Sequence, residues 1–88
     1  DLAVTYVLFN TFADANLEDA NFKNANLSST SFNSANLTNA DLSGANLRNA
    51  FLDSADLSNA NLEDAILDNA ILSNANLKCL NHPICLNG

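Results

Sequence analysis

Three residues near the C-terminus have side chains that could do chemistry, namely Cys79, His82 and Cys85. Cys79 and Cys85 are the only cysteines of the chain. The segment between them contains Asn81 and Pro83, which favour a chain reversal, so the two thiols can meet across a short loop. We therefore expect a disulfide between Cys79 and Cys85. Such a bond would hold this end of the chain closed and indicate an oxidising compartment.

Two other interpretations of these residues stay open. A metal site could use Cys79, His82 and Cys85, but these are three ligands with no evident fourth. The cysteines could instead be free thiols in a reducing compartment. With His82 as the only histidine of the chain, a hydrolase triad is not supported. We therefore predict no catalytic residues, no metal and no cofactor.

Acidic residues dominate the charge of the chain. Ten Asp and Glu stand against Lys23, Arg48 and Lys78, which gives a net charge of −7. Binding to nucleic-acid phosphate and electrostatic anchoring to a membrane both need clustered basic residues. No apolar run approaches the ~20 residues that span a bilayer. We therefore expect no nucleic-acid partner and no membrane insertion.

Some of the acidic side chains are close together in the sequence. They form two groups: Asp14, Glu18 and Asp19 in one, and Glu63, Asp64 and Asp68 in the other. Carboxylates are the usual ligands of divalent cations, but shallow surface carboxylates are more simply explained as solvated groups. We therefore predict no metal site at either group.

A period of five residues organises the rest of the chain. A large apolar residue recurs at every fifth position, eleven times Leu and three times Phe. These residues, which we expect to form a core ladder, are Phe12, Leu17, Phe22, Leu27, Phe32, Leu37, Leu42, Leu47, Leu52, Leu57, Leu62, Leu67, Leu72 and Leu77. From Ala15 to Ala75 an alanine stands two residues before each of them, with Thr30 as the exception.

Neither regular secondary structure buries residues at this spacing. Five residues advance an α-helix by about 500°, so successive leucines would spiral round its axis. In a flat strand an odd spacing sends them to opposite faces. The pattern is satisfied when the chain turns a corner in every unit, and the Asn, Asp, Ser, Thr and Gly between the core residues favour turns. Four corners close a coil of about twenty residues, so Phe12 should stack on Phe32.

The tandem phrase A-(D/N)-L-x-x, clearest between Ala35 and Leu62, resembles the pentapeptide-repeat family. The resemblance implies an all-β fold, a right-handed quadrilateral (four-sided) β-helix in which the Leu or Phe and the small residue two before it point inward. The sequence departs from the family pattern at Thr30, and at Phe51, Ile66 and Ile71, where an apolar residue replaces Asn or Asp.

We expect three parts in one domain. Residues 11–77 would form the β-helix of about four coils. Residues 1–10 would form an irregular first coil or N-terminal cap. Residues 78–88 would form a C-terminal cap, because the period stops there and Pro83 cannot donate to a ladder between coils. The chain begins with Asp1 and not with Met, so we also expect that an N-terminal segment was removed.

Phe51, Ile66 and Ile71 form a candidate interaction patch. Phe51 and Ile71 would face solvent on adjacent rungs, with Ile66 on the neighbouring side. One interpretation is a face for protein interaction or self-association. The other is that isolated exposed apolar residues are ordinary on a protein surface.

These observations favour a non-catalytic structural or protein-interaction module over an enzyme. The partner would be an unidentified protein, and the chain would be a monomer or a weak homodimer. A disulfide would place it in the thylakoid lumen or the periplasm, with the cytoplasm as the alternative. The family resemblance adds a second function, because some acidic members mimic DNA and bind a DNA-processing enzyme such as gyrase.

Overall fold

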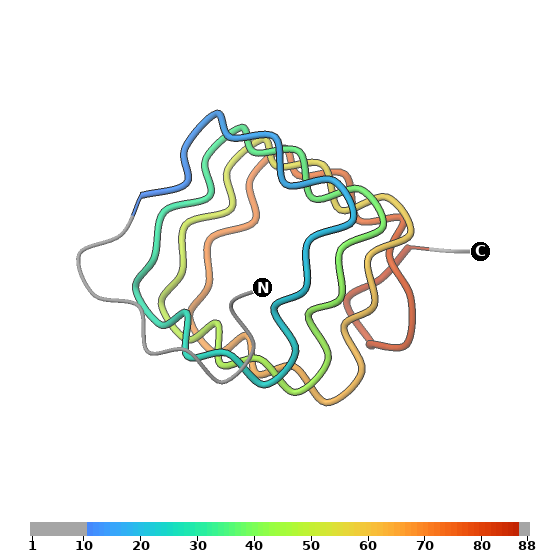
Figure 1. The fold of residues 1–88 in the computed structure, drawn as a ribbon. Coiled ribbons are helices and arrows are strands. Elements are labelled where there is room, and N and C mark those ends of the chain that lie inside the picture. The colour runs from blue at the N-terminus through green and yellow to red at the C-terminus, as the bar shows by residue number, and fades with distance from the viewer. Residues whose placement is uncertain (1–10, 87–88) are drawn as a thin grey trace.

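The computed structural model describes residues 11–86, and these wind into a coil with four sides (Figure 1). Within these residues the secondary structure consists of turns and single-residue parallel bridges, and no helix is long and apolar enough to cross a membrane. The bridges join Thr11 to Ser31, Asn16 to Asn36, Asn21 to Asp41, Asn26 to Asn46, Ser31 to Phe51, Asn36 to Asp56, Asp41 to Asn61, Asn46 to Ile66, Phe51 to Ile71, Asp56 to Asn76 and Asn61 to Leu80. All pairs but the last are twenty residues apart, so twenty residues make one coil, as the spacing predicts.

A β-turn follows each large apolar residue from Phe12 to Leu72. The backbone N–H of the residue three positions later donates to its carbonyl, as Ala45 does to Leu42 at 3.0 Å. The third residue of each turn has a φ between 59° and 68°. This left-handed conformation, typical of a type II turn, is tolerated by Gly and by small polar residues. This conformation explains why the third residue of each turn is Asn, Asp, Ser or Gly.

A side-chain hydrogen bond closes most corners from outside. The Asn or Asp that precedes the core residue accepts, through Oδ1, the backbone N–H two residues further on, as Asn61 does from Glu63 at 3.1 Å. The residues that do so are Asn16, Asn21, Asn26, Asn36, Asp41, Asn46, Asp56, Asn61 and Asn76. We call this contact the corner bond. It is an Asx turn, so the polar residue of the repeat has a structural role.

The large apolar residues stack inside the coil. The fully buried ones are Phe22, Leu27, Phe32, Leu37, Leu42, Leu47, Leu52, Leu57 and Leu62. Phe12 stacks on Phe32 with ring centroids 5.4 Å apart, which confirms the predicted stacking. Phe22 meets both rings edge-on. Burial of each large side chain stabilises the fold by about 1.5–3 kcal/mol.

Five residues of the expected ladder are only half-buried. They are Phe12, Leu17, Leu67, Leu72 and Leu77. A ladder residue in a middle coil is covered by the coil before it and the coil after it, whereas a ladder residue near either end of residues 11–86 has only one of these neighbours among the described residues. The expected irregular first coil at residues 1–10 lies outside the described residues.

The repeat loses one residue just before the C-terminal segment. Leu80 pairs with Asn61 at a separation of nineteen residues. Its N–H donates to Ala60 O at 2.9 Å, and its carbonyl accepts from Leu62 N–H at 3.0 Å. These are the bonds that residue 81 would make in an unbroken repeat. Cys79 therefore takes the inward position of an alanine and is fully buried.

Candidate functional site

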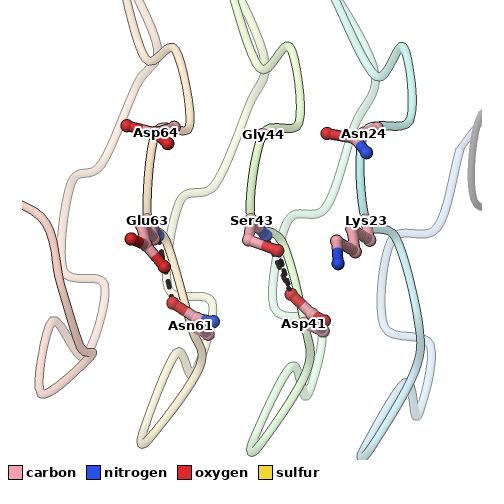
Figure 2. A pocket seen from close by; sticks show the side chains of 8 residues that line it. All are labelled: Lys23, Asn24, Asp41, Ser43, Gly44, Asn61, Glu63 and Asp64. Carbon is pink, nitrogen blue, oxygen red and sulfur yellow. Dashed lines mark hydrogen bonds between the residues drawn. The ribbon is translucent and has the colours of Figure 1, made fainter.

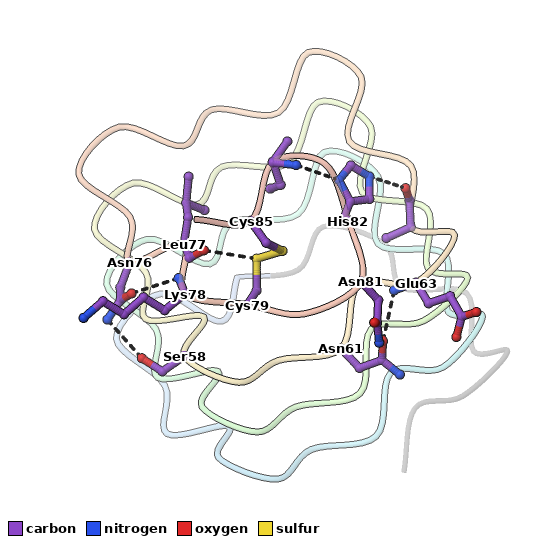
Figure 3. The surroundings of a disulfide bond; sticks show 12 residues. Ser58, Asn61, Glu63, Asn76, Leu77, Lys78, Cys79, Asn81, His82 and Cys85 are labelled. Carbon is purple, nitrogen blue, oxygen red and sulfur yellow. Dashed lines mark hydrogen bonds between the residues drawn. A yellow bond between two sulfur atoms is a disulfide. The ribbon is translucent and has the colours of Figure 1, made fainter. Parts of the chain in front are cut away.

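The disulfide between Cys79 and Cys85 lies at the C-terminal end of the coil (Figure 3). The two Cα atoms are 5.0 Å apart. Cys79 belongs to the buried core, and the half-buried Cys85 packs against it. Leu86 N–H donates to Leu77 O at 2.6 Å, which holds the chain after Cys85 against the last repeat unit. The disulfide thus ties residues 80–86 to the core.

His82 holds the same segment through both ring nitrogens (Figure 3). Nδ1 accepts the backbone N–H of Ile84 at 3.2 Å, so it carries no proton. Nε2 therefore carries the proton and donates to Ala65 O at 3.1 Å. In the regular coils the corresponding alanine carbonyl accepts a backbone N–H from the next coil, as Ala45 O does from Ile66. At Ala65 O the imidazole thus takes the place of a backbone N–H, a role that the sequence did not predict.

Two exposed apolar side chains lie on one side of the coil. We call this side the Phe51 face; it comprises residues 11–15, 31–35, 51–55 and 71–75. Phe51 is 42% exposed and Ile71 is 41% exposed, and the two form a parallel bridge on adjacent rungs. Ile66 lies on the preceding side and is half-buried. The other large apolar side chains exposed among the described residues, Leu80 and Leu86, belong to the C-terminal segment.

The Phe51 face lacks most of its corner bonds. Thr11 makes one through Oγ1 to Ala13 N–H at 3.1 Å. The side chains of Phe51 and Ile71 have no acceptor atom, and Ser31 makes no such bond within residues 11–86. Each missing bond forgoes about 0.5–1.5 kcal/mol of stabilisation. Phe51 and Ile71 are therefore not explained by the stability of their own corners.

Two polar atoms near these corners have no partner. Asn33 Oδ1 and Asp53 Oδ1 are the buried side-chain atoms that lack a hydrogen bond in the described residues. Asn33 and Asp53 stand twenty residues apart, so they occupy equivalent positions on adjacent coils of the Phe51 face. Buried acceptors without a donor are uncommon in native structures.

A polar hollow of about 310 Å³ lies on the side opposite the Phe51 face (Figure 2). Its walls are Lys23, Asn24, Asp41, Ser43, Gly44, Asn61, Glu63 and Asp64. Gly44, with φ +68°, lies in its wall, where a Cβ would collide with Asn24 Oδ1.

Of the carboxylates in this hollow, that of Asp41 is held by two hydrogen bonds from Ser43. A hydrogen bond from the Ser43 hydroxyl, followed by one from the Ser43 backbone N–H, lowers the pKa of Asp41 below 3.8. Glu63 and Asp64 from one acidic group of the sequence also line the hollow. Among residues 11–86, no three His, Cys, Asp or Glu side chains are placed to hold a metal ion. The Ser43 hydroxyl donates to the Asp41 carboxylate within the hollow, which presents a polar surface.

Two of the solved structures similar to this one come from cyanobacteria. Rfr23, a pentapeptide repeat protein from Cyanothece 51142, aligns with a TM-score of 0.77 and 31% sequence identity over 92% of this chain and 53% of its own. HetL, a pentapeptide repeat protein from Nostoc sp. strain PCC 7120 that is involved in the regulation of heterocyst differentiation, aligns with a TM-score of 0.63 and 33% identity over 91% of this chain and 40% of its own. The present chain thus spans about half the length of these proteins or less. No curated protein matches it.

The family assignment comes from the repeats themselves. The sequence model of pentapeptide repeats matches residues 12–49 and 55–81, in eight copies. These residues are the ones that form the twenty-residue coils with inward Leu, Phe and Ala. The chain therefore belongs to the pentapeptide repeat family, whose members form right-handed quadrilateral β-helices.

Proposed function

We propose that this chain is a non-catalytic protein-interaction module that binds a protein partner through Phe51, Ile66 and Ile71. The observation that supports this most strongly is the pair of adjacent side chains, Phe51 and Ile71, each more than two-fifths exposed. A contiguous exposed apolar surface is typical of an interface. Ile66 is half-buried and would extend the surface round the edge of the coil.

The filled interior supports a role other than catalysis. Enzymes bind substrates in a concave site lined by apolar groups with a few convergent polar ones. Here the ladder from Phe22 to Leu62 fills the coil, and the hollow around Gly44 is shallow and polar. The rigid outer surface is what remains for function.

The experiment that tests the proposal is affinity capture from the compartment in which the protein occurs. Wild type is compared with Phe51→Asn/Ile71→Asn, which places corner-bond acceptors at both positions. Glu18→Ser/Thr38→Ser, on adjacent rungs of the neighbouring side, is the matched control. We expect the control to keep a partner that the Phe51/Ile71 variant loses. Equal recovery with all three proteins would contradict the proposal.

The disulfide supports a location in an oxidising compartment, the thylakoid lumen or the periplasm. Thiol titration of the protein isolated from its cells, unfolded with and without reductant, tests this. We expect reactive thiols only after reduction. Two reactive thiols without reductant would favour the cytoplasmic alternative.

The second candidate function is a DNA-mimicking binder of a DNA-processing enzyme such as gyrase. The net charge of −7 is the observation that favours it. A supercoiling assay separates the two candidates, because a DNA mimic inhibits or protects the enzyme whether or not Phe51 and Ile71 are replaced. No effect of the wild type on gyrase would remove this candidate.

A further inference from the structure

The Phe51 face differs from the other three sides in having no basic residue. It carries Asp14 and Asp53 and no Lys or Arg. The three basic residues, Lys23, Arg48 and Lys78, are distributed one to each of the other sides. The exposed apolar pair is therefore flanked by acidic groups that no basic residue of the same side neutralises.

Asp53 also differs from Asp41 and Asp56 in its hydrogen bonding. Asp41 and Asp56 are each held by a serine hydroxyl two residues further on. Asp53 receives no such bond in the described part of the chain, and its Oδ1 is buried without a donor. A rotation about its side-chain bonds can therefore bring the carboxylate out to a donor without breaking an existing contact.

Asn33 Oδ1, one rung away, is a second buried acceptor that has no donor in the described residues. A surface with exposed Phe51 and Ile71, a carboxylate and an amide oxygen that both lack donors is complementary to a group with apolar and cationic parts. The planar guanidinium of Arg fits best, because it donates two parallel bonds to a carboxylate and stacks on an aromatic ring. A lysine supplies the charge without the stacking.

We infer that the Phe51 face binds a protein segment in which Arg or Lys stands beside an aliphatic or aromatic side chain. The apolar side chain covers Phe51 and Ile71, and the cation bonds to Asp53 and Asn33. This inference deepens the proposed function and depends on it. An anionic nucleic acid is disfavoured by the same charges.

Binding to short synthetic peptides tests this chemistry. One peptide set pairs an Arg with a Leu or Phe, and a matched set has Glu in place of Arg. Fluorescence polarisation is measured with wild type, Asp53→Asn, Phe51→Asn/Ile71→Asn and a control, Asp64→Asn, which removes one charge from the opposite side. Circular dichroism establishes that all four proteins are folded.

We expect the wild type and Asp64→Asn to bind the Arg peptides at least about tenfold more tightly than the Glu peptides. Asp53→Asn should remove most of that preference, and Phe51→Asn/Ile71→Asn should remove binding. Added salt should weaken the binding of wild type more than that of Asp53→Asn. Equal binding of Arg and Glu peptides, or equal losses in Asp53→Asn and Asp64→Asn, would overturn the inference.

The partner captured under "Proposed function" distinguishes a failure of this inference from a failure of that function. If the partner is lost from the Phe51/Ile71 variant but binds wild type and Asp53→Asn equally, the interaction face stands and the cationic segment is wrong. If the partner binds all variants, both are wrong. Sedimentation of the purified protein tests whether a second copy of this chain occupies the Phe51 face. A dimer that dissociates in Phe51→Asn/Ile71→Asn would overturn the inference.

Discussion

The middle of the coil and its C-terminal end are built from the same five-residue unit but bury it differently. Leu52 is fully buried, and its N–H donates to Ile71 O at 2.8 Å. Leu72, one rung later, is half-buried, and its N–H has no backbone acceptor among residues 11–86. The unit is the same, so the difference arises from the neighbouring coil. Stability in this fold is a property of adjacent coils and not of single units.

The largest effect is expected when one leucine in the middle and one at the C-terminal end are each replaced by alanine. Leu42→Ala removes a side chain that is covered on both sides, and should lower the free energy of unfolding by about 2–5 kcal/mol. Leu72→Ala removes a half-buried one and should cost less than about half as much, because water already reaches the site. Denaturant unfolding followed by circular dichroism measures both. Equal losses would mean that the end is packed as tightly as the middle.

At the C-terminal end a covalent bond joins residues 80–86 to the core. Cys79→Ala/Cys85→Ala leaves an alanine in the position that alanine fills elsewhere in the repeat, so packing inside should be retained. Loss of a cross-link over so short a loop should lower the free energy of unfolding by about 2 kcal/mol.

Amide hydrogen exchange measures which part of the coil loses stability when the disulfide is absent. Exchange should accelerate most at Leu80, whose N–H donates to Ala60 O, and least at Leu42. Reduced wild type should match the double variant. Uniform acceleration along the whole coil would show that the end and the middle unfold as one unit.

A smaller effect is expected from the imidazole at the same end. His82→Asn keeps an acceptor within reach of Ile84 N–H but cannot reach Ala65 O, whereas His82→Ala removes both contacts. We expect losses of about 1 kcal/mol and about 2 kcal/mol respectively. Nitrogen NMR of the wild-type ring should find the proton on Nε2. A proton on Nδ1 would contradict the contact to Ile84.

Much of the middle follows from the sequence, because each unit faces the same neighbours. The period of five predicts the inward Leu and Phe, the corners at Asn, Asp and Ser, and the stack of Phe12 on Phe32. The end is harder, because it depends on the loss of one residue. That loss can be recognised only by treating Asn76–Cys79 as a four-residue unit with Cys79 in the alanine position.

Side-chain contacts between segments that are distant in the sequence could not be predicted either. The bond from His82 to Ala65 depends on how the last segment folds back. The missing donors at Asn33 and Asp53 depend on side-chain placement across two coils. The period places the outward residues in columns, but it does not show which of them hydrogen bond.

The smallest predicted effect concerns the corners of the middle coils in acid. The pKa of Asp56 lies below 3.8, chiefly because the Ser58 hydroxyl, and then its backbone N–H, donate to the carboxylate. A carboxyl whose pKa is lowered by folding stabilises the protein above its unfolded pKa, and that stabilisation is lost as the pH falls through the folded value. Ser58→Ala removes the larger of the two bonds. The free energy of unfolding should therefore fall less steeply with decreasing pH, from about pH 5 downward, in this variant than in wild type.

The matched control for this prediction is Ser73→Ala. Ser73 occupies the same position of its unit, but the residue two before it is Ile71 and not an aspartate. Its replacement should leave the slope of stability against pH unchanged, because no carboxylate depends on its hydroxyl. Parallel curves for wild type and Ser58→Ala would contradict the prediction, because the Ser58 hydroxyl would then have no part in the acid response of this corner. The corners at Phe51 and Ile71, which have no carboxylate at this position, would lack this acid response in either case.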